Sequence, residues 1–281
     1  GPCWKPVGML LSAADWKHKT VIDSEKQYKQ PKTLKEKFVE PLIVVDPVDK
    51  QRNVAAAVRA QKLDEFVAAS REFLKTPNMK FFYQPKTKAL NQTELLENMR
   101  QRGSCLVFIK VKGKIVVPDV LWGQLYKSQK ALRKILTQND FLVLQDTVWS
   151  NEKSLNVFVF ELKNRLIPNM KLQLGPPLSK KQECEKFLQK HQSSDLTVCG
   201  PRIEESRWVV DVKRDYTDAV VLLKDKLHDG GKQEGVANIV AEAVGSLEVL
   251  INDEILSVYC LDSGFARFLT KFLDGKPLWL N

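Results

Sequence analysis

The stretch of residues 104–162 constrains the fold most strongly, because its apolar residues change their spacing in a fixed order. Ser104–Val111 is apolar and β-branched, which predicts a buried strand. From Pro118 onward, apolar residues recur every three or four positions, which predicts a helix. Phe141–Trp149 and Ser154–Leu162 then predict two strands joined by a hairpin turn. Strand, helix, strand, strand is the order of half a ferredoxin-like sandwich, so we expect an α+β fold.

A short connection is expected between the first strand and the helix. Lys112-Gly113-Lys114 predicts a tight turn, and Ile115–Val117 predicts a further strand. Sheets of this type often present one face to RNA. The sequence lacks the aromatic stacking signature of an RRM, which disfavours that class of domain.

Changes in sequence pattern divide the chain into three expected parts, residues 1–78, 79–175 and 176–281. The first part is expected to be all-helical, and the second to hold the antiparallel sheet with its helices. The third is expected to be a small α/β unit whose last helix returns to the second part. The second boundary lies at Gly175-Pro176-Pro177, because adjacent prolines interrupt regular structure.

The elements of the outer parts follow from apolar spacing and from stop signals. In the first part we expect helices at Gly8–Trp16 and through Leu63–Leu74, the second of which Pro77 closes. In the third part Ser179 predicts the N-cap of a helix that runs to about Lys190. The remaining elements expected there are strands at Leu196–Cys199 and Trp208–Val212, a helix at Thr217–Leu227 ended by Gly230-Gly231, and a helix through Phe265–Leu273 stopped by Gly275.

The net charge of +10 and the pI near 9.3 favour a polyanionic partner. The lysines are interleaved with Trp122, Tyr126, Trp149 and Trp208 and are not gathered in a tail. This distribution favours folded RNA recognition over a disordered basic arm. No apolar run is long enough to span a bilayer, and no signal-peptide pattern occurs, so no membrane partner is expected.

The five cysteines are scattered singly, and neither a disulfide framework nor a structural zinc site fits their spacing. The three histidines, His18, His191 and His228, lie far apart beside polar residues, so we expect them on the surface. These features favour a reducing, cytoplasmic setting. The first residues, Gly1-Pro2, are typical of a protease scar, so we expect the natural protein to begin further upstream.

A charged turn at Asp46–Asn53 is the main candidate for a binding site. Leu42–Val45 before it is strand-like, Pro47 interrupts regular structure, and Asn53 predicts the N-cap of a following helix. Arg52 would then project beside a helix N-terminus, which attracts anions, and could meet a phosphate or the edge of a nucleobase. The alternative is a capped helix whose arginine is merely solvated.

A complete active site is not expected. Nucleotide polymerisation needs two carboxylates that hold paired magnesium ions, usually after a Gly-Ser that grips the triphosphate. Gly103-Ser104 precedes a strand without an acidic pair, and Gly245-Ser246 precedes Glu248 and Asp253 at the wrong spacing. We expect structural roles for both, and we predict no catalytic and no metal-binding residue in this chain. A Ser-His-Asp, Cys-His or phosphate-loop pattern cannot be argued either.

Several segments together resemble archaeal (class I) CCA-adding enzymes. Glu40–Val58, which includes the charged turn, resembles the neck motif of that family. Other segments that resemble the family are Asp119–Leu125, Thr147–Trp149, Phe160–Leu162, Gly175–Pro177 with the helix after it, and the ending Phe268–Leu280. The resemblance runs from about residue 7 to the end, and several motifs in the right order make it specific.

The resemblance implies a tRNA nucleotidyltransferase that adds C, C and A to the tRNA 3′ end from CTP and ATP without a nucleic-acid template. Residues 1–78 are then the end of the neck, 79–175 the body and 176–281 the tail. The head domain, which would bind Mg²⁺, is expected to be absent, and the chain alone to be inactive. The implied partners are the tRNA acceptor stem, the TΨC arm and a catalytic head. Whether the protein forms a homodimer is left open.

The resemblance also implies roles for single residues. Arg52 corresponds to the neck arginine that hydrogen-bonds the base of the incoming CTP or ATP, on a turn formed by Asp46, Asp49 and Asn53. The residues expected to approach tRNA are Trp122, Gln124 and Lys127 in the body, and Lys180, Lys181, Arg202, Arg207, Lys213 and Arg214 in the tail. The chain departs from the family pattern at Lys50, where proline is usual, and at Arg59, where serine or threonine is usual. These departures could change the conformation of the turn and therefore the direction in which the Arg52 side chain points.

Two alternatives remain. A nucleotidyltransferase of the oligoadenylate-synthetase type shares a similar D-P-x-D turn, but the body and tail motifs have no counterpart there. A non-enzymatic RNA-binding module could also keep this architecture without a head.

Overall fold

The computed structural model describes residues 12–83 and 87–280. The chain forms two compact units, one of residues 1–86 with 275–281 and the other of residues 87–274. The mixture of helices and antiparallel sheets confirms the expected α+β class. No helix in the described residues is long and apolar enough to cross a membrane.

The first unit contains a small parallel sheet, so the all-helical expectation for this region is wrong. Strands β1 (Thr20–Ile22) and β2 (Leu42–Val44) pair in parallel, with α2 (Pro31–Lys37) between them in the chain. Helix α3 (Ala60–Lys75) confirms the helix predicted through this segment. Of the helix expected from Gly8 to Trp16, Ser12 and Ala13 are helical, and residues 8–11 lie outside the described residues.

Two short 3-10 helices complete the first unit. They are η1 (Met79–Phe81) and η4 (Leu278–Leu280). The ring of Phe81 stacks on the ring of Trp279, with 5.8 Å between the centroids. The final residues of the chain therefore belong to this unit, although the helix before them belongs to the other.

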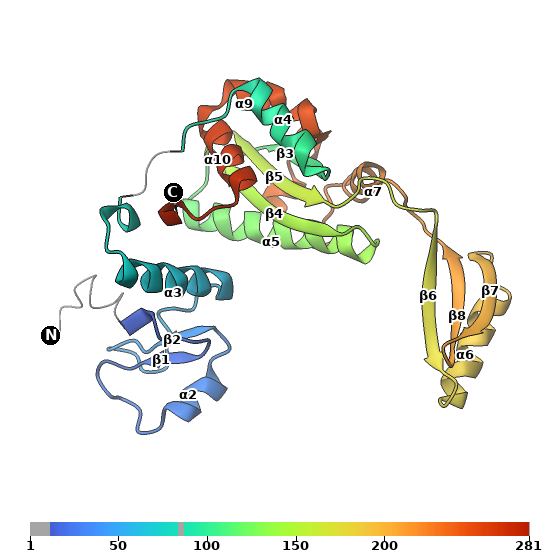
Figure 1. Cartoon of the computed structure of the whole chain (residues 1–281), viewed down its shortest axis with the longest axis horizontal. Coiled ribbons are helices and arrows are strands. Elements are labelled where there is room, and N and C mark those ends of the chain that lie inside the picture. The colour runs from blue at the N-terminus through green and yellow to red at the C-terminus, as the bar shows by residue number, and fades with distance from the viewer. Residues whose placement is uncertain (1–11, 84–86, 281) are drawn as a thin grey trace. The chain divides into compact units, whose positions relative to one another are not determined.

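The second unit is built on a four-stranded antiparallel sheet in the order β4-β5-β3-β9. Figure 1 labels β3, β4 and β5 of this sheet. Its strands are β3 (Cys105–Lys112), β4 (Val143–Ser150), β5 (Leu155–Leu162) and β9 (Glu248–Ile251). Helix α5 (Pro118–Gln138) connects β3 to β4, and α7 (Ala219–Lys226) precedes β9. The predicted half of a ferredoxin-like sandwich is confirmed, and β9 completes the sheet from much later in the chain.

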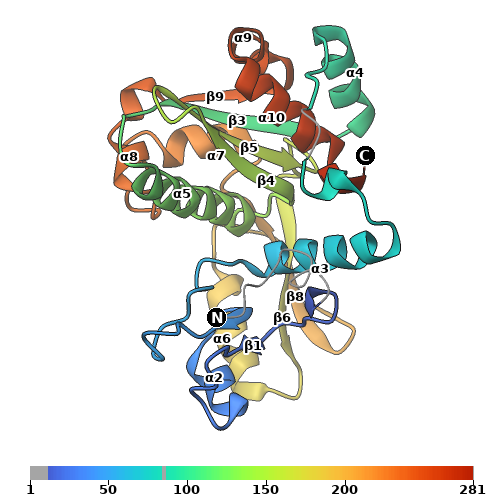
Figure 2. The same cartoon turned by 90° about the vertical axis from the view of Figure 1, so that its left-hand side faces the viewer.

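Helices cover both faces of this sheet (Figure 2). Along β3, Val107 and Ile109 pack with the helices α5, α7 and α8 (Asn238–Ala241). The alternate residues, Leu106 and Phe108, belong to a second core with three other helices. These are α4 (Gln92–Arg102), α9 (Leu256–Leu261) and α10 (Ser263–Asp274), with η2 (Val244–Ser246) and η3 (Asn252–Ile255) flanking β9.

Ile115–Val117 does not form the strand that its sequence predicted. These residues form an irregular connection, with the side chains of Ile115 and Val117 exposed. Strand β3 already pairs with β5 on one side and β9 on the other, so no free edge remains beside it.

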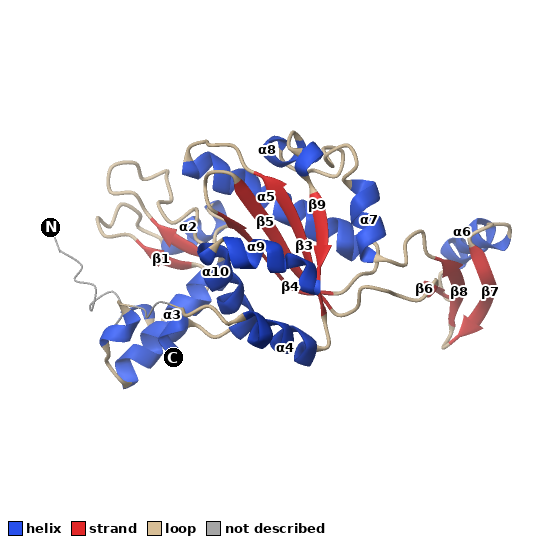
Figure 3. Ribbon diagram, turned by 90° about the horizontal axis from the view of Figure 1, so that it is seen from above, coloured by secondary structure: helices blue, strands red, loops and turns tan. Residues whose placement is uncertain are grey.

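A separate three-stranded antiparallel sheet is inserted between β5 and α7 (Figure 3). It has the order β6-β8-β7 and is formed by β6 (Met170–Pro177), β7 (Thr197–Glu204) and β8 (Arg207–Lys213), with α6 (Lys181–Gln192) against it. Gly175-Pro176-Pro177 is the end of β6 and not a break before it. Lys180, and not Ser179, is the N-cap residue of α6, and it makes no side-chain cap bond.

Paired contacts tie the two chain segments that lead into and out of this insert. The Arg165 guanidinium binds the Asp218 carboxylate, with Nη2 2.7 Å from Oδ2. The N–H of Ile167 donates to the carbonyl of Thr217 over 2.9 Å. Asp218 also caps α7 by accepting from the N–H of Val220. One carboxylate therefore anchors both the insert and the next helix of the larger sheet.

Candidate functional site

The charged turn is held by its own aspartates, as the sequence predicted. Asp46 Oδ1 accepts from the N–H groups of Val48 (2.8 Å) and Asp49 (3.2 Å), and Asp49 Oδ1 accepts from the N–H of Gln51 (2.9 Å). The bonds from Val48 and Asp49 stabilise the carboxylate and lower the pKa of Asp46. Both carboxylates therefore satisfy the backbone of the turn.

Asn53 is not the N-cap of a helix, contrary to the prediction. It is buried and forms an isolated bridge with Val45, and its Oδ1 accepts from the N–H groups of Val44 (2.9 Å) and Ala55 (3.0 Å). Its Nδ2 donates to the carbonyl of Leu42 over 3.0 Å. Residues 54–57 form turns, and α3 begins only at Ala60. The Asn53 side chain therefore joins the neighbouring strand to the turn that follows it.

Arg52 is held through its backbone and presents its side chain to solvent. Its N–H donates to the carbonyl of Asp49 (2.9 Å), and its carbonyl accepts from the N–H of Asp46 (3.1 Å). The guanidinium is 70% exposed, and its Nη1 lies 3.9 Å from Asp46 Oδ2. Because no helix starts at Asn53, Arg52 gains nothing from a helix dipole. Its binding capacity rests on five N–H donors that project from a fixed turn.

The predicted body residues are divided between internal and exposed roles. Gln124 Oε1 accepts from the N–H of Ile239 over 3.0 Å, so this side chain joins α5 to α8. Trp122 Nε1 donates to Glu152 Oε1 over 2.8 Å, and its ring lies 5.7 Å from that of Tyr126. Lys127 is exposed on the same helix.

The predicted tail residues also fall into two groups. Three of them form ion pairs: Arg202 with Glu204 and Asp211, Arg214 with Asp140, and Lys180 with Glu183. Arg214 also donates to the carbonyl of Pro168 and is largely buried. The other three, Lys181, Arg207 and Lys213, have no acidic partner among the described residues.

The described residues bring together no large cluster of metal-ligating side chains. They contain no cluster of three or more histidine, cysteine, aspartate or glutamate side chains that could hold a metal ion. The hydroxyl of Ser104 binds Glu161, and the Oγ of Ser246 accepts from the N–H of Lys112 over 3.0 Å. Glu248 pairs with Lys110 across the sheet. Both Gly-Ser pairs therefore have structural roles, as predicted, and we derive no metal-dependent step from these residues.

His191 is buried, contrary to the prediction that all three histidines lie on the surface. Its ring packs against that of Phe187, with 4.6 Å between the centroids, and its pKa is lowered by burial and by the nearby Lys190. The spacing of Cys184, Phe187, Leu188 and His191 places all four on one helix face, and this signal could have revealed it. His18 and His228 are exposed, as expected.

Comparison with known proteins identifies two family models in order along the chain. The model for the second domain of tRNA nucleotidyltransferases matches residues 7–83, and the model for the C-terminal domain of CCA-adding enzymes matches residues 102–251. The boundary between the two matches lies close to the boundary between the two compact units.

Curated relatives named as CCA-adding enzymes cover most of the chain. The protein from Methanosarcina mazei is 36% identical over 83% of this chain, and the protein from Methanothermobacter thermautotrophicus is 30% identical over 95% of it. The protein from Halobacterium salinarum is 29% identical over 95% of the chain. The matches take in 50%, 56% and 57% of these relatives, so the chain spans about half their length.

Proposed function

The chain belongs to the CCA-adding enzyme family, and on this premise we propose that it supplies the tRNA-binding and base-selecting part of a tRNA nucleotidyltransferase. The whole enzyme would add C, C and A to the tRNA 3′ end from CTP and ATP. The observation that carries the base-selecting role is the geometry of Arg52, whose backbone is fixed on both sides while its guanidinium stays open.

Arg52 would hydrogen-bond the base of the incoming CTP or ATP. The guanidinium offers a planar fork of donors that can meet different acceptors on the two bases. Asp46 and Asp49 would act indirectly, because Oδ1 of each carboxylate accepts from the backbone of the turn. Asn53 would act in the same indirect way, by tying the turn to β2.

The second unit would bind the acceptor stem and the TΨC arm. Lys127, Lys181, Arg207 and Lys213 are the predicted residues best placed for this, because they are at least partly exposed and have no acidic partner among the described residues. Trp122 is partly exposed, but its ring N–H already donates to Glu152. Gln124, Lys180, Arg202 and Arg214 are weaker candidates, because each already has a protein partner. The proposed parts remain neck, body and tail, and the pairing of β6 with β8 favours a body–tail boundary before Met170.

The metal carboxylates and the triphosphate grip would come from a head domain outside this chain. The internal bonds of Ser104 and Ser246 support this part of the proposal, because both Gly-Ser serines are already bound within the fold. The whole enzyme would work in the cytoplasm, where tRNA is its substrate.

A minihelix made of the acceptor stem and TΨC arm is expected to bind this chain with a steep salt dependence. About five phosphate contacts would give a slope of roughly −4 to −5 in log K against log salt. Fluorescence anisotropy at salt concentrations between about 50 and 200 mM measures this slope. Equal binding to single strands of the same length would contradict the proposal and favour a general RNA-binding module.

A further inference from the structure

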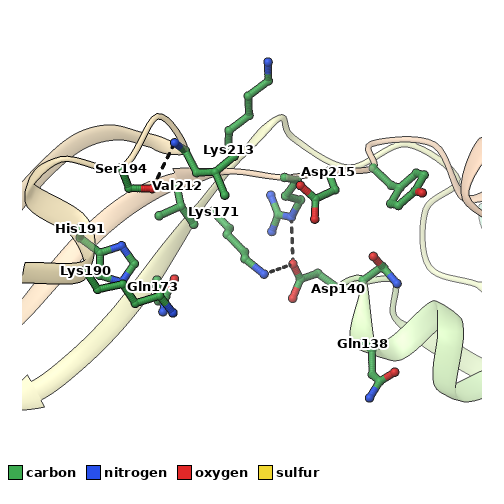
Figure 4. Close-up of a pocket in the computed structure, with 14 residues that line it drawn as sticks. Gln138, Asp140, Lys171, Gln173, Lys190, His191, Ser194, Val212, Lys213 and Asp215 are labelled. Atoms are coloured by element: carbon green, nitrogen blue, oxygen red, sulfur yellow. Dashed lines mark hydrogen bonds and ion pairs between the residues drawn. The ribbon is translucent and has the colours of Figure 1, made fainter. Parts of the chain in front are cut away.

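A pocket of about 220 Å³ lies where the C-terminal end of α5 faces the inserted sheet (Figure 4). It is lined from α5 and the residues after it, from β6, from α6 and from β8. Four cationic and two acidic side chains line it: Lys171, Lys190, Lys213, Arg214, Asp140 and Asp215. The pocket thus has an excess of positive charge even when His191, which also lines it, is neutral.

His191 supplies the observation that points to a ligand. Its side chain lines the pocket, the residue is only 4% exposed, and neither ring nitrogen has a hydrogen-bond partner in the described protein. A neutral imidazole carries one N–H donor and one acceptor. Leaving a buried polar group unsatisfied costs about 1–3 kcal/mol, so such a group usually has a partner.

The charges around the ring favour an anion as that partner. Asp140 is already bound by Lys171, with Nζ 2.8 Å from Oδ2, and by Arg214, with Nε 3.2 Å from the same oxygen. Figure 4 shows both interactions beside the pocket. Lys190 and Lys213 have no acidic partner among the described residues. The carboxylate of Asp140 is therefore neutralised. Lys190 and Lys213 outnumber Asp215, the other acidic residue of the lining, which leaves an excess of positive charge.

We propose that this pocket binds one phosphate group of an RNA backbone, with His191 and Lys190 as donors and Lys213 nearby. This inference rests on the proposed function, because tRNA is the polyanion that the chain would meet. The volume lies below the roughly 300–1,000 Å³ of pockets that hold whole small ligands, which suits a single phosphate better than a free cofactor.

Binding would be linked to the protonation of His191. A phosphate beside the ring favours imidazolium and raises the pKa that burial had lowered. The complex would then bind more protons than the free protein, so affinity would rise as the pH falls. The charged residues that line the pocket from other elements are Asp140, Lys171, Lys213, Arg214 and Asp215. Histidine is the residue type whose charge ordinarily changes between about pH 5 and 8, so a change in affinity over this interval would report on His191.

The first test compares two lysines on α6. Lys190→Gln is expected to weaken minihelix binding about three- to tenfold and to reduce the size of the salt slope by about one. Lys186→Gln removes the same charge one turn earlier on the same helix, outside the pocket lining, and is expected to change both quantities much less. Equal effects from the two substitutions would overturn the proposal. Because Lys190 is exposed, this comparison does not depend on the tolerance of the buried histidine.

The second test follows His191 directly. An NMR titration measures the pKa of His191 from the chemical shift of its ring proton. The chain has three histidines, and the signal that is missing from the spectrum of His191→Gln is the one from His191. The minihelix is expected to raise this pKa, and His191→Gln to remove the rise in affinity between about pH 7.5 and 5.5. Inorganic phosphate is expected to produce the same shift only at much higher concentration.

The outcomes separate this proposal from the broader one. A shift with inorganic phosphate but not with the minihelix would assign the pocket to a free anion and overturn the RNA assignment. No shift with either would mean that the pocket is not a phosphate site. If the minihelix binds with a steep salt slope and neither Lys190→Gln nor His191→Gln changes its affinity, the proposed function stands and only the phosphate site in the pocket is refuted. Failure of the minihelix to bind at all would refute both.

Discussion

Glu161→Ala is expected to destabilise the second unit by about 3–5 kcal/mol, because it removes one partner of a buried ion pair. Glu161 is 3% exposed on β5. Arg102 contacts both of its carboxylate oxygens, with Nε 2.8 Å from Oε1 and Nη2 2.7 Å from Oε2. Gln145 donates to Oε2 over 2.6 Å, and the Ser104 hydroxyl also binds Oε1. Without the carboxylate, these partly buried donors would lose their acceptor.

The same network predicts a loss of stability in acid. Burial alone would raise the pKa of Glu161, but the bonds from Arg102, Ser104 and Gln145 outweigh it and lower the pKa to about 2. A carboxyl with a lowered pKa stabilises the fold fully above its unfolded value near 4.5, and this contribution is lost as the pH falls toward 2. The wild type should therefore lose more stability in this interval than Glu161→Gln, which cannot titrate.

Urea unfolding followed by circular dichroism measures both effects. The matched control is Glu242→Gln, which breaks the exposed pair with Lys114 and is expected to leave the free energy of unfolding nearly unchanged. If Glu161→Ala unfolds at the same urea concentration as this control, the network does not stabilise the unit. A parallel loss of stability with pH in wild type and Glu161→Gln would show that another carboxyl is responsible.

The sequence predicts local elements of this protein well and long-range pairings poorly. The apolar spacing of residues 104–162 predicted β3, α5, β4 and β5, because each depends on a continuous segment. The partner of Glu161 could not be predicted in the same way, since Glu161 lies on strand β5 and Arg102 lies 59 positions earlier, at the end of helix α4. Strand β9 was missed for a similar reason, because its pairing with β3 joins residues about 140 positions apart, as in Val107 with Ile251.

The candidate site shows the same division. The turn at Asp46–Asn53 was predicted, and the aspartate bonds that hold it are local. The helix expected directly after Asn53 was wrong, because this side chain is buried and binds Leu42 and Val44 on β2 as well as Ala55 in the following turn. His191 was assigned to the surface from its polar neighbours, whereas the fold buries one face of α6 against the inserted sheet.

Arg52→Ala in the complete enzyme is expected to lower kcat/KM for both CTP and ATP by about 10- to 100-fold, the size expected for losing charged hydrogen bonds to a ligand. Arg52→Lys should recover little of this, because lysine keeps the charge but lacks the planar fork. Neither change should alter the melting temperature, since the side chain is 70% exposed. Single-nucleotide extension of tRNA ending before each added base measures CTP and ATP use separately.

Asn53→Ala and Gln51→Ala distinguish base contact from support of the turn. Asn53→Ala leaves the N–H groups of Val44 and Ala55 without their acceptor, so it should reduce stability by about 2–4 kcal/mol and reduce activity together with it. Gln51 is exposed on the same turn, and Gln51→Ala should change neither quantity. Wild-type incorporation of both nucleotides by Arg52→Ala would refute the base-selecting role. A loss confined to stability would instead make Arg52 part of the turn's support, because only a direct contact lowers kcat/KM while the fold stays unchanged.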